Sequence, residues 1–353
     1  MSAAEKPYDP AVIKDVLFRY FNMSSVRSQL SVQETRFLGL GGPQFRYFRF
    51  KLTDGSHTAH AFGKTTLYHD REYRALQYLT TTSPEAQRNA SRPIASLQHA
   101  GYSFLLLEYL HGYSSPLTIG SLLRSFPTTT SITHLGRRII DKIYLLQKQA
   151  PFSYTPLSFN DTEQTPAQPV PVDIFVQLGR IKSLSIGAKQ ALERRLTAII
   201  SSHTLVRRGL VHGQLGMRNI FVNHSDVMFI DWEYMQSAGF CLFDPCYMAI
   251  MLLMRAVQLL IASSKLDIIN RDLFEHIRSC EESITDDLNS KVIADGLSFA
   301  KAIAMIDTLY EYEAGGGSSL KALVGQKYRK IKYLTCHIEK DAANGVRCEG
   351  FSL

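Results

Sequence analysis

The sequence has no long uninterrupted hydrophobic run. Its most apolar stretch, residues 247–262, is too short to cross a bilayer and carries Arg255 in its middle. We therefore expect a buried core helix there and no membrane span. The first ten residues, MSAAEKPYDP, contain no basic segment followed by an apolar core, so the sequence predicts no signal peptide.

Cysteine and tryptophan are scarce. The five cysteines form an odd number and include no C-x-x-C pair, so the sequence supports neither a disulfide framework nor a zinc site. Such a chain is expected in a reducing compartment, the cytoplasm. His57, His60 and His69 show no metal-ligand grouping. The single tryptophan, Trp232, could line a cage for a quaternary ammonium ligand, but packing in the core is the favoured interpretation.

The charge balance is only mildly basic, with a formal net charge of +7 and a pI near 9.1. This excess is compatible with anionic ligands such as nucleotides, but also with proteins that bind no anion. A basic helix is predicted at residues 321–340. A solvated helix face is favoured there, because no aromatic-interleaved motif accompanies it, and no specific nucleic-acid partner is expected.

The chain is long enough for a large core and two or three structural units, since 45% of its 353 residues are hydrophobic. A helix is predicted to begin at the capping pair Asp9-Pro10. Aromatic alternation in residues 36–64 then predicts two or three antiparallel strands, with a hairpin at Asp54-Gly55.

The remaining patterns change from strand to helix along the chain. A helix at residues 70–81 and a strand near 102–110 follow the hairpin, and apolar spacing predicts a strong helix at 135–149. Residues 150–172 are rich in Pro, Thr and Ser and predict a long loop. Strands first and helices later is typical of an α+β protein with two lobes.

The most informative stretch is HGQLGMRN, residues 212–219, which is followed by IDWE at residues 230–233. The short apolar runs between these segments predict a hairpin, which would bring Asn219 and Asp231 together. Amide and carboxylate oxygens are ligands that Mg²⁺ accepts in proteins. The sequence therefore predicts that these two side chains can share one Mg²⁺.

Other parts needed to hold a nucleoside triphosphate occur upstream. Lys64 ends a predicted strand, and Glu72 follows eight residues later on a helix, where its carboxylate could pair with the lysine. Gly39, Gly41 and Gly42 lie in a turn where the backbone could approach phosphate, although they fit no strict G-x-G-x-x-G spacing. The sequence thus contains a lysine that can be fixed, two metal ligands and a glycine turn where the backbone can approach phosphate.

This set of residues resembles the aminoglycoside phosphotransferase and choline kinase group, the small-molecule branch of the protein-kinase-like fold. The family's H-G-D-x-x-x-x-N loop is matched by His212, Gly213 and Asn219, and its I-D-W-E segment by residues 230–233. The resemblance covers roughly residues 30–265 in consistent order.

The resemblance implies a two-lobed α+β fold with a small antiparallel β N-lobe and a larger, mostly helical C-lobe. Gly239 and Asp244 match a G…D pair downstream of the loop. The expected division of the chain is an N-terminal helical segment (1–30), the N-lobe (31–107), a hinge (108–112), the C-lobe (113–315) and a basic C-terminal helix and tail (316–353).

The resemblance also implies cofactors and roles, with ATP and Mg²⁺ as the expected ligands. Lys64 would contact the α and β phosphates and be oriented by Glu72, while Asn219 and Asp231 would bind Mg²⁺ with Glu233 as a supporting or second-metal carboxylate. The other implicated positions are His212 as a brace of its loop, Gly41 and Gly42 near the phosphates, and the backbone from Glu108 to Leu110 near adenine.

The loop departs from the family at a position that matters for chemistry. The family has an aspartate that accepts or orients the hydroxyl proton of the substrate, whereas this chain has Gln214, and an amide has no useful basicity. Losing a general base costs on the order of 10²–10⁴ in rate. Phosphoryl transfer is largely positioning and charge neutralisation, so some activity could survive. Arg218 could neutralise phosphate charge or face solvent.

Three hypotheses follow. The favoured one is a kinase-fold protein that binds Mg·ATP with weak or absent catalysis, a pseudokinase that regulates or scaffolds a protein partner. The second is an active but atypical phosphotransferase for a small-molecule hydroxyl acceptor. The third is an interaction protein without nucleotide binding, against which the retained Lys64, Glu72, Asn219 and Asp231 argue.

Overall fold

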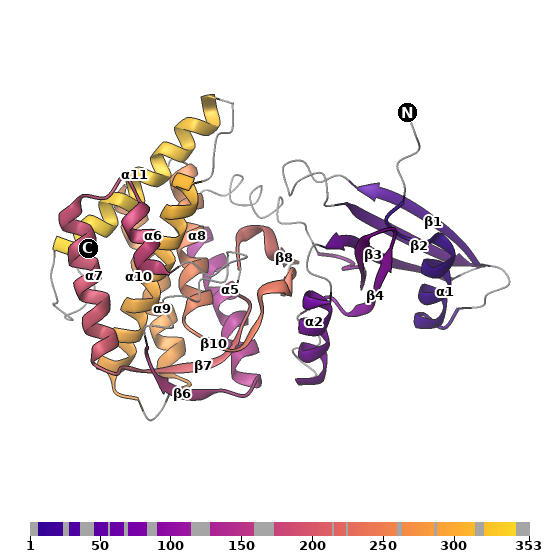
Figure 1. Ribbon diagram of the computed structural model, residues 1–353, viewed down its shortest axis with the longest axis horizontal. Coiled ribbons are helices and arrows are strands. Elements are labelled where there is room, and N and C mark those ends of the chain that lie inside the picture. Colours follow the sequence, from indigo (N-terminus) through magenta and orange to yellow (C-terminus); the bar gives the residue numbers. More distant parts are fainter. Residues whose placement is uncertain are drawn as a thin grey trace. The chain divides into compact units, whose positions relative to one another are not determined.

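The computed structural model describes residues 6–23, 28–35, 46–55, 57–66, 70–82, 90–113, 128–158, 173–213, 215–223, 225–259, 263–285, 288–314 and 321–343. The chain forms two compact units (Figure 1). The first comprises Met1–Tyr113 and Met228–Tyr234, and the second comprises Ser114–Val227 and Met235–Leu353. The first unit is built on an antiparallel sheet and the second is mainly helical, which is the predicted α+β class.

The first unit contains a five-stranded antiparallel sheet in the order β1-β2-β3-β5-β4. Its strands are β1 (Ser28–Thr35), β2 (Tyr47–Asp54), β3 (His57–Thr66), β4 (Pro93–His99) and β5 (Tyr102–Glu108). The hairpin predicted at Asp54-Gly55 is confirmed, because Asp54 pairs with His57 and Gly55 adopts a φ of 55° that suits glycine.

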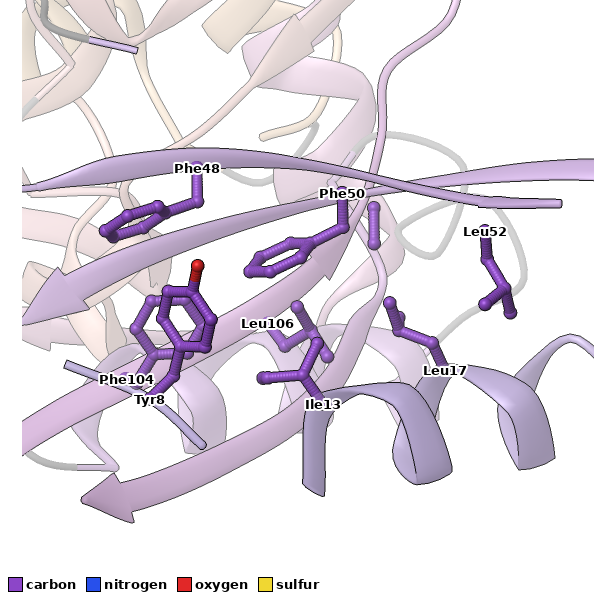
Figure 2. Packing of buried hydrophobic residues seen from close by; sticks show 9 residues of the cluster. Tyr8, Ile13, Leu17, Phe48, Phe50, Leu52, Phe104 and Leu106 are labelled. Carbon is purple, nitrogen blue, oxygen red and sulfur yellow. The ribbon is translucent and has the colours of Figure 1, made fainter. Parts of the chain in front are cut away.

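Helix α1 (Pro10–Tyr20) covers one face of this sheet. Its predicted start is confirmed: Asp9 Oδ1 accepts a hydrogen bond of 2.8 Å from the Ala11 backbone N–H, and Pro10 is the first helical residue. Figure 2 shows Ile13 and Leu17 of this helix facing the aromatic side chains of the sheet. The buried residues of this cluster are Tyr8, Ile13, Leu17, Phe48, Phe50, Leu52, Ala61, Phe104 and Leu106.

Alternation along β3 places its side chains on opposite faces of the sheet. On the α1 face there is no room for a side chain at Gly63, since a Cβ there would clash with the rings of Phe104 and Phe50. The next residue, Lys64, therefore points to the other face, where α2 (Arg71–Thr82) packs. The aromatic core on one face thus fixes which residue of β3 faces the helix on the other.

The second unit combines seven α-helices, counted over its described residues, with a small sheet in the order β10-β7-β6. The helices are α5 (Thr129–Gln149), α6 (Ile174–Arg180), α7 (Ile186–Ser201), α8 (Phe243–Gln258), α9 (Ser263–Glu282), α10 (Ser290–Ala314) and α11 (Lys321–Ala343), and a short 3-10 turn, η2 (Met217–Asn219), lies in the same unit. The sheet strands are β6 (Ser153–Pro156), β7 (Leu205–Val211) and β10 (Gln236–Phe240). The predicted core helix is α8, and no helix in the described part of the chain is long and apolar enough to cross a membrane.

Five of the described strands were not predicted. Four of them lie at the edges of their sheets, β1 and β4 in the first unit and β6 and β10 in the second, and the fifth, β7, is the central strand of the second unit's sheet. The prediction of an unbroken loop at residues 150–172 is wrong where β6 lies, and strands begin at Ser28 rather than after residue 36. An edge strand is paired on one side only and is partly exposed, so it carries a weak apolar alternation.

A buried carboxyl on α10 makes the stability of this unit depend on pH. Asp307 is fully buried, and its Oδ1 accepts a hydrogen bond of 3.2 Å from Gln177 Nε2. Burial raises the pKa of Asp307 from 3.8 to about 6, against the smaller opposing effect of that hydrogen bond. The native state therefore keeps a proton that the unfolded state loses, and the stabilisation is lost as the pH rises through about 6.

Replacing this group with an amide, Asp307→Asn, is expected to remove that loss. Between about pH 5 and pH 7.5, the free energy of unfolding of the wild type should fall by roughly 1–2 kcal/mol relative to that of the variant, as measured by urea unfolding. The matched control is Asp295→Asn on the same helix, at a partly exposed position. A constant difference for Asp307→Asn would contradict the expected protonation.

Candidate functional site

A buried lysine joins two carboxylates in the first unit. Lys64 on β3 lies with its Nζ 2.6 Å from Glu72 Oε2 and 2.6 Å from Asp231 Oδ1. Glu72 is in the first turn of α2, and Asp231 follows β9 (Val227–Phe229). The exposed fractions of the side chains are 13% for Lys64, 3% for Glu72 and 30% for Asp231. The expected Lys64–Glu72 pair is present, and Asp231 completes it.

A third carboxylate, Glu233, joins this cluster from the 3-10 turn η3 (Trp232–Tyr234). Oxygen atoms of Glu72, Asp231 and Glu233 all lie within 4.8 Å of one another. Burial, followed by the charge of Asp231, raises the pKa of Glu233 to about 7. This rise is what is expected when several carboxylates crowd around one cation in a half-buried place.

The backbone at Asp231 has an unusual conformation. Its φ is 69°, in the left-handed region that residues other than glycine seldom adopt. The neighbouring Trp232 is 2% exposed, and its Nε1–H donates to the Phe229 carbonyl at 3.0 Å. Trp232 thus packs in the core, as favoured, and its anchoring holds the turn that aims Asp231 at Lys64.

The charges of the cluster do not balance. Burial lowers the pKa of Lys64, but Asp231 and Glu72 raise it by more, so the lysine is held as a cation. With all three carboxylates ionised, one cation faces three anions and the nominal net charge is −2. Burial also raises the pKa of Glu72, against the effect of Lys64. Three hard oxygen donors with an excess of negative charge fit Mg²⁺ in ligand type.

Two neighbours of the cluster were not predicted from the sequence. Tyr47 lies opposite Lys64 in the β2–β3 pairing, and burial raises its pKa, with Asp231 and Glu233 adding to the effect. Arg71 lies with its guanidinium 5.5 Å from the ring centre of Tyr234. Tyr47 could have been found, since a two-residue hairpin loop after Asp54 sets the whole register.

The stretch at residues 212–219 belongs to the second unit. A buried aspartate forms hydrogen bonds with the backbone at its start. Asp244, in the first turn of α8, accepts hydrogen bonds from the backbone N–H of His212 at 2.6 Å and of Gly213 at 3.1 Å. Burial raises the pKa of Asp244 to about 7, against these two bonds. Gly213 has a φ of 88°, which explains the glycine. His212 is 2% exposed.

Asn219 and Arg218 lie in η2, in the same unit. The backbone N–H of Asn219 donates to the Gly216 carbonyl at 2.9 Å. The side chain of Arg218 lies outside the described part of the chain, as do Gln214 and the glycines Gly41 and Gly42. Sharing of one Mg²⁺ by Asn219 and Asp231 stays a prediction.

The predicted hinge begins at the end of β5. The backbone N–H of Glu108 donates to the Arg92 carbonyl at 2.9 Å, and its carbonyl accepts from Ser91 Oγ at 2.8 Å. Its carboxylate accepts from Tyr20 Oη of α1 at 2.8 Å. Both main-chain groups of Glu108 are therefore occupied, and among the predicted adenine contacts Leu110 is the better candidate.

Solved structures with a kinase-like fold are similar to this chain. A choline kinase from Cryptosporidium parvum Iowa II is 11% identical, with 95% of this chain and 97% of that chain covered and a TM-score of 0.52. The chain therefore has the two-lobed α+β, protein-kinase-like fold of such structures.

Two other solved structures show lower similarity. A thermostable mutant of aminoglycoside phosphotransferase APH(4)-Ia, in a ternary complex with ADP and hygromycin B, is 14% identical over 95% of this chain and 99% of that chain, with a TM-score of 0.49. Choline kinase LicA from Streptococcus pneumoniae is 16% identical over 92% and 98%, with a TM-score of 0.42. No model of a known protein family matches the chain, and no curated protein matches its sequence.

Proposed function

We propose that the protein binds a magnesium nucleoside triphosphate, ATP, and transfers its phosphoryl group slowly or not at all. The observation that carries this proposal is the position of Lys64, 2.6 Å from both Glu72 and Asp231. A lysine fixed in this way can contact phosphate oxygens, and the carboxylates around it can hold a divalent cation. The kinase-like fold supports the same interpretation.

The charge of the cluster sets a condition on binding. With its carboxylates ionised, the cluster has an excess of negative charge that would repel a free triphosphate, so binding should depend on Mg²⁺. When bound, Mg²⁺ would neutralise phosphate charge. Asp231 and Glu233 would hold it, while Glu72 keeps Lys64 in place. The Gly41-Gly42 turn would approach the phosphates, and the backbone at Leu110 would meet adenine.

Weak turnover follows from Gln214, which occupies the position of the catalytic aspartate in the resembling family. Its amide can orient a hydroxyl group but cannot accept the proton. The alternative is an active kinase for a small hydroxyl compound, and the likeness to a choline kinase supports it. Phosphorylation of such a compound at a rate typical of kinases would favour that alternative.

A thermal-shift titration with ATP tests the proposal. With Mg²⁺ present, saturating ATP should raise the melting temperature of the wild type by several degrees, because a ligand that binds only the folded state stabilises it. ATP without Mg²⁺ should give little change. In Asp231→Ala the Mg²⁺-dependent rise should disappear, since the variant loses a metal ligand and a partner of Lys64.

The matched control is Asp15→Ala on α1, an exposed aspartate paired with Arg19, which should keep the full shift. A wild type that shows no shift with millimolar Mg·ATP would contradict nucleotide binding. The third hypothesis, an interaction protein without nucleotide, would then be preferred. A shift retained in full by Asp231→Ala would overturn the metal assignment while leaving nucleotide binding in place.

A further inference from the structure

A second group of potential metal ligands lies in the helical unit and includes none of the residues assigned above. Asp141 is on α5, and His276 and Cys280 are on α9. The last two are four residues apart, so they stand one above the other on the same face of the helix. The two helices pack against each other, which brings Asp141 to the same place.

The three potential ligand atoms converge on one point. His276 Nε2 lies 2.7 Å from Asp141 Oδ1 and 3.7 Å from Cys280 Sγ, and Cys280 Sγ lies 3.8 Å from Asp141 Oδ1. Tetrahedral Zn²⁺ with ordinary bond lengths needs about 3.6 Å between sulfur and either light atom, and about 3.3 Å between nitrogen and oxygen. Two of the three separations already fit, and the third needs to open by roughly half an ångström.

The geometry disfavours a catalytic relay. In a nucleophile–histidine–aspartate relay, the two ring nitrogens contact different partners. Here the carboxylate and the thiol both approach the same nitrogen, Nε2 of His276. When one nitrogen, one sulfur and one oxygen all lie close together in this way, they are arranged like the ligands of a single metal ion.

The scaffold is rigid enough to hold such a site. At Gly136 of α5, a Cβ would approach Leu273 Cδ2 of α9 to 2.5 Å, so these helices touch closely near the cluster. Beyond it, Tyr144 Oη donates to the Ile277 carbonyl at 3.2 Å. Close packing on both sides of the donors limits the rearrangement needed to bind an ion.

We propose that Asp141, His276 and Cys280 form a binding site for Zn²⁺, with the fourth position open to water. A thiolate, an imidazole and a carboxylate are all zinc ligands, and the sulfur disfavours Mg²⁺ and Ca²⁺. The side chains of Asp141 and His276 are 59% and 23% exposed, so an ion can reach them from solvent. The sequence supported no zinc site because only two of the three donors are close in the chain.

Titration of the reduced, metal-free full chain with Co²⁺ tests this site. Co²⁺ binds at zinc sites, and its absorption spectrum depends on the type and geometry of its ligands. We expect one equivalent to give thiolate-to-cobalt absorption in the near ultraviolet with tetrahedral visible bands, and Zn²⁺ to abolish both by displacement. Cys280→Ser should lose the near-ultraviolet absorption, and His276→Ala should weaken binding by more than about 10-fold.

Controls separate this site from other thiols, imidazoles and carboxylates. Cys336→Ser, at an exposed cysteine, and His134→Ala, at an exposed histidine on α5, should keep the full signal. Asp231→Ala should also keep it, because the first unit's cluster has no sulfur. Circular dichroism of each variant verifies folding. Absence of a thiolate band in the wild type, or its persistence in Cys280→Ser, would overturn the proposal and leave a simple histidine–aspartate hydrogen bond.

Discussion

Lys64→Met is expected to lower the free energy of unfolding by about 3 kcal/mol at neutral pH. The change removes the cation that lies 2.6 Å from two carboxylates, while the methylene volume is largely kept. Glu72, with a side chain 3% exposed, then remains in a buried place without its partner. Leaving one member of a buried pair unpaired costs more than the intact pair contributes.

The pH dependence of this variant provides a check on the cause. Lys64 favours the ionised form of Glu72, so its stabilising effect is present where this carboxylate is ionised and is lost as the pH falls and the carboxylate takes up a proton. The difference between the wild type and Lys64→Met should therefore shrink below neutral pH. Urea unfolding at several pH values measures it, and a difference that does not change with pH would contradict the electrostatic origin.

Lys64→Met should affect the binding of Mg²⁺ alone and the binding of Mg·ATP differently. The nominal charge of the cluster changes from −2 to −3, so Mg²⁺ alone should bind at least as well as in the wild type. Mg·ATP should bind worse, because the phosphate contact is lost. Calorimetry with each ligand measures both effects. The control is Lys51→Met at an exposed position of β2, which should change neither.

Glu281→Ala is expected to destabilise the second unit by about 3–5 kcal/mol. Arg207 on β7 is buried, and its Nε and Nη2 donate to the two oxygens of Glu281 at 3.1 and 2.9 Å. The same Nη2 donates to Gln147 Oε1 at 2.9 Å, and Gln147 in turn donates to the Cys241 carbonyl. Removing the carboxylate leaves a buried guanidinium that faces the Gln147 amide and the rings of Tyr144 and Phe152, none of which carries a compensating charge.

The adjacent residue provides a close control. Glu282 pairs with Arg278 four residues earlier on the same helix, but its side chain is 42% exposed. Glu282→Ala should cost no more than about 0.5 kcal/mol. Replacing both members of the buried pair, Arg207→Met with Glu281→Leu, should cost less than Glu281→Ala alone. Urea unfolding compares all three, and equal effects for Glu281→Ala and Glu282→Ala would refute the buried network.

Much of the local structure could be predicted because it is encoded by periodicity and by turn and cap residues. Asp9-Pro10 marks the start of α1, and Asp54-Gly55 marks the hairpin whose register places Tyr47 opposite Lys64. The strongly amphipathic helix α5 was predicted from its apolar spacing. Edge strands such as β1 and β6 escaped prediction because half of their pairing and burial is missing.

The candidate site was partly visible in the chain as an ordered set of residue types. Lys64, Glu72 and Asp231 were singled out by spacing and by a family resemblance, and their ion pairs are present. The role of Asp244 was not predicted. From the first turn of α8, its carboxylate accepts hydrogen bonds from the backbone N–H groups of His212 and Gly213. Backbone hydrogen bonds to a distant carboxylate leave no pattern in the sequence.

The sequence by itself determined the elements with strong periodicity, the hairpin register, and the residue types available for phosphate and metal. Only the tertiary structure decided which distant side chains meet. It placed Asp231 beside Lys64, buried Glu281 against Arg207, and brought Asp141 to His276 and Cys280. The physical reason is that periodicity of 2 or 3.6 residues acts over neighbours in the chain, whereas these contacts depend on packing between elements far apart in sequence.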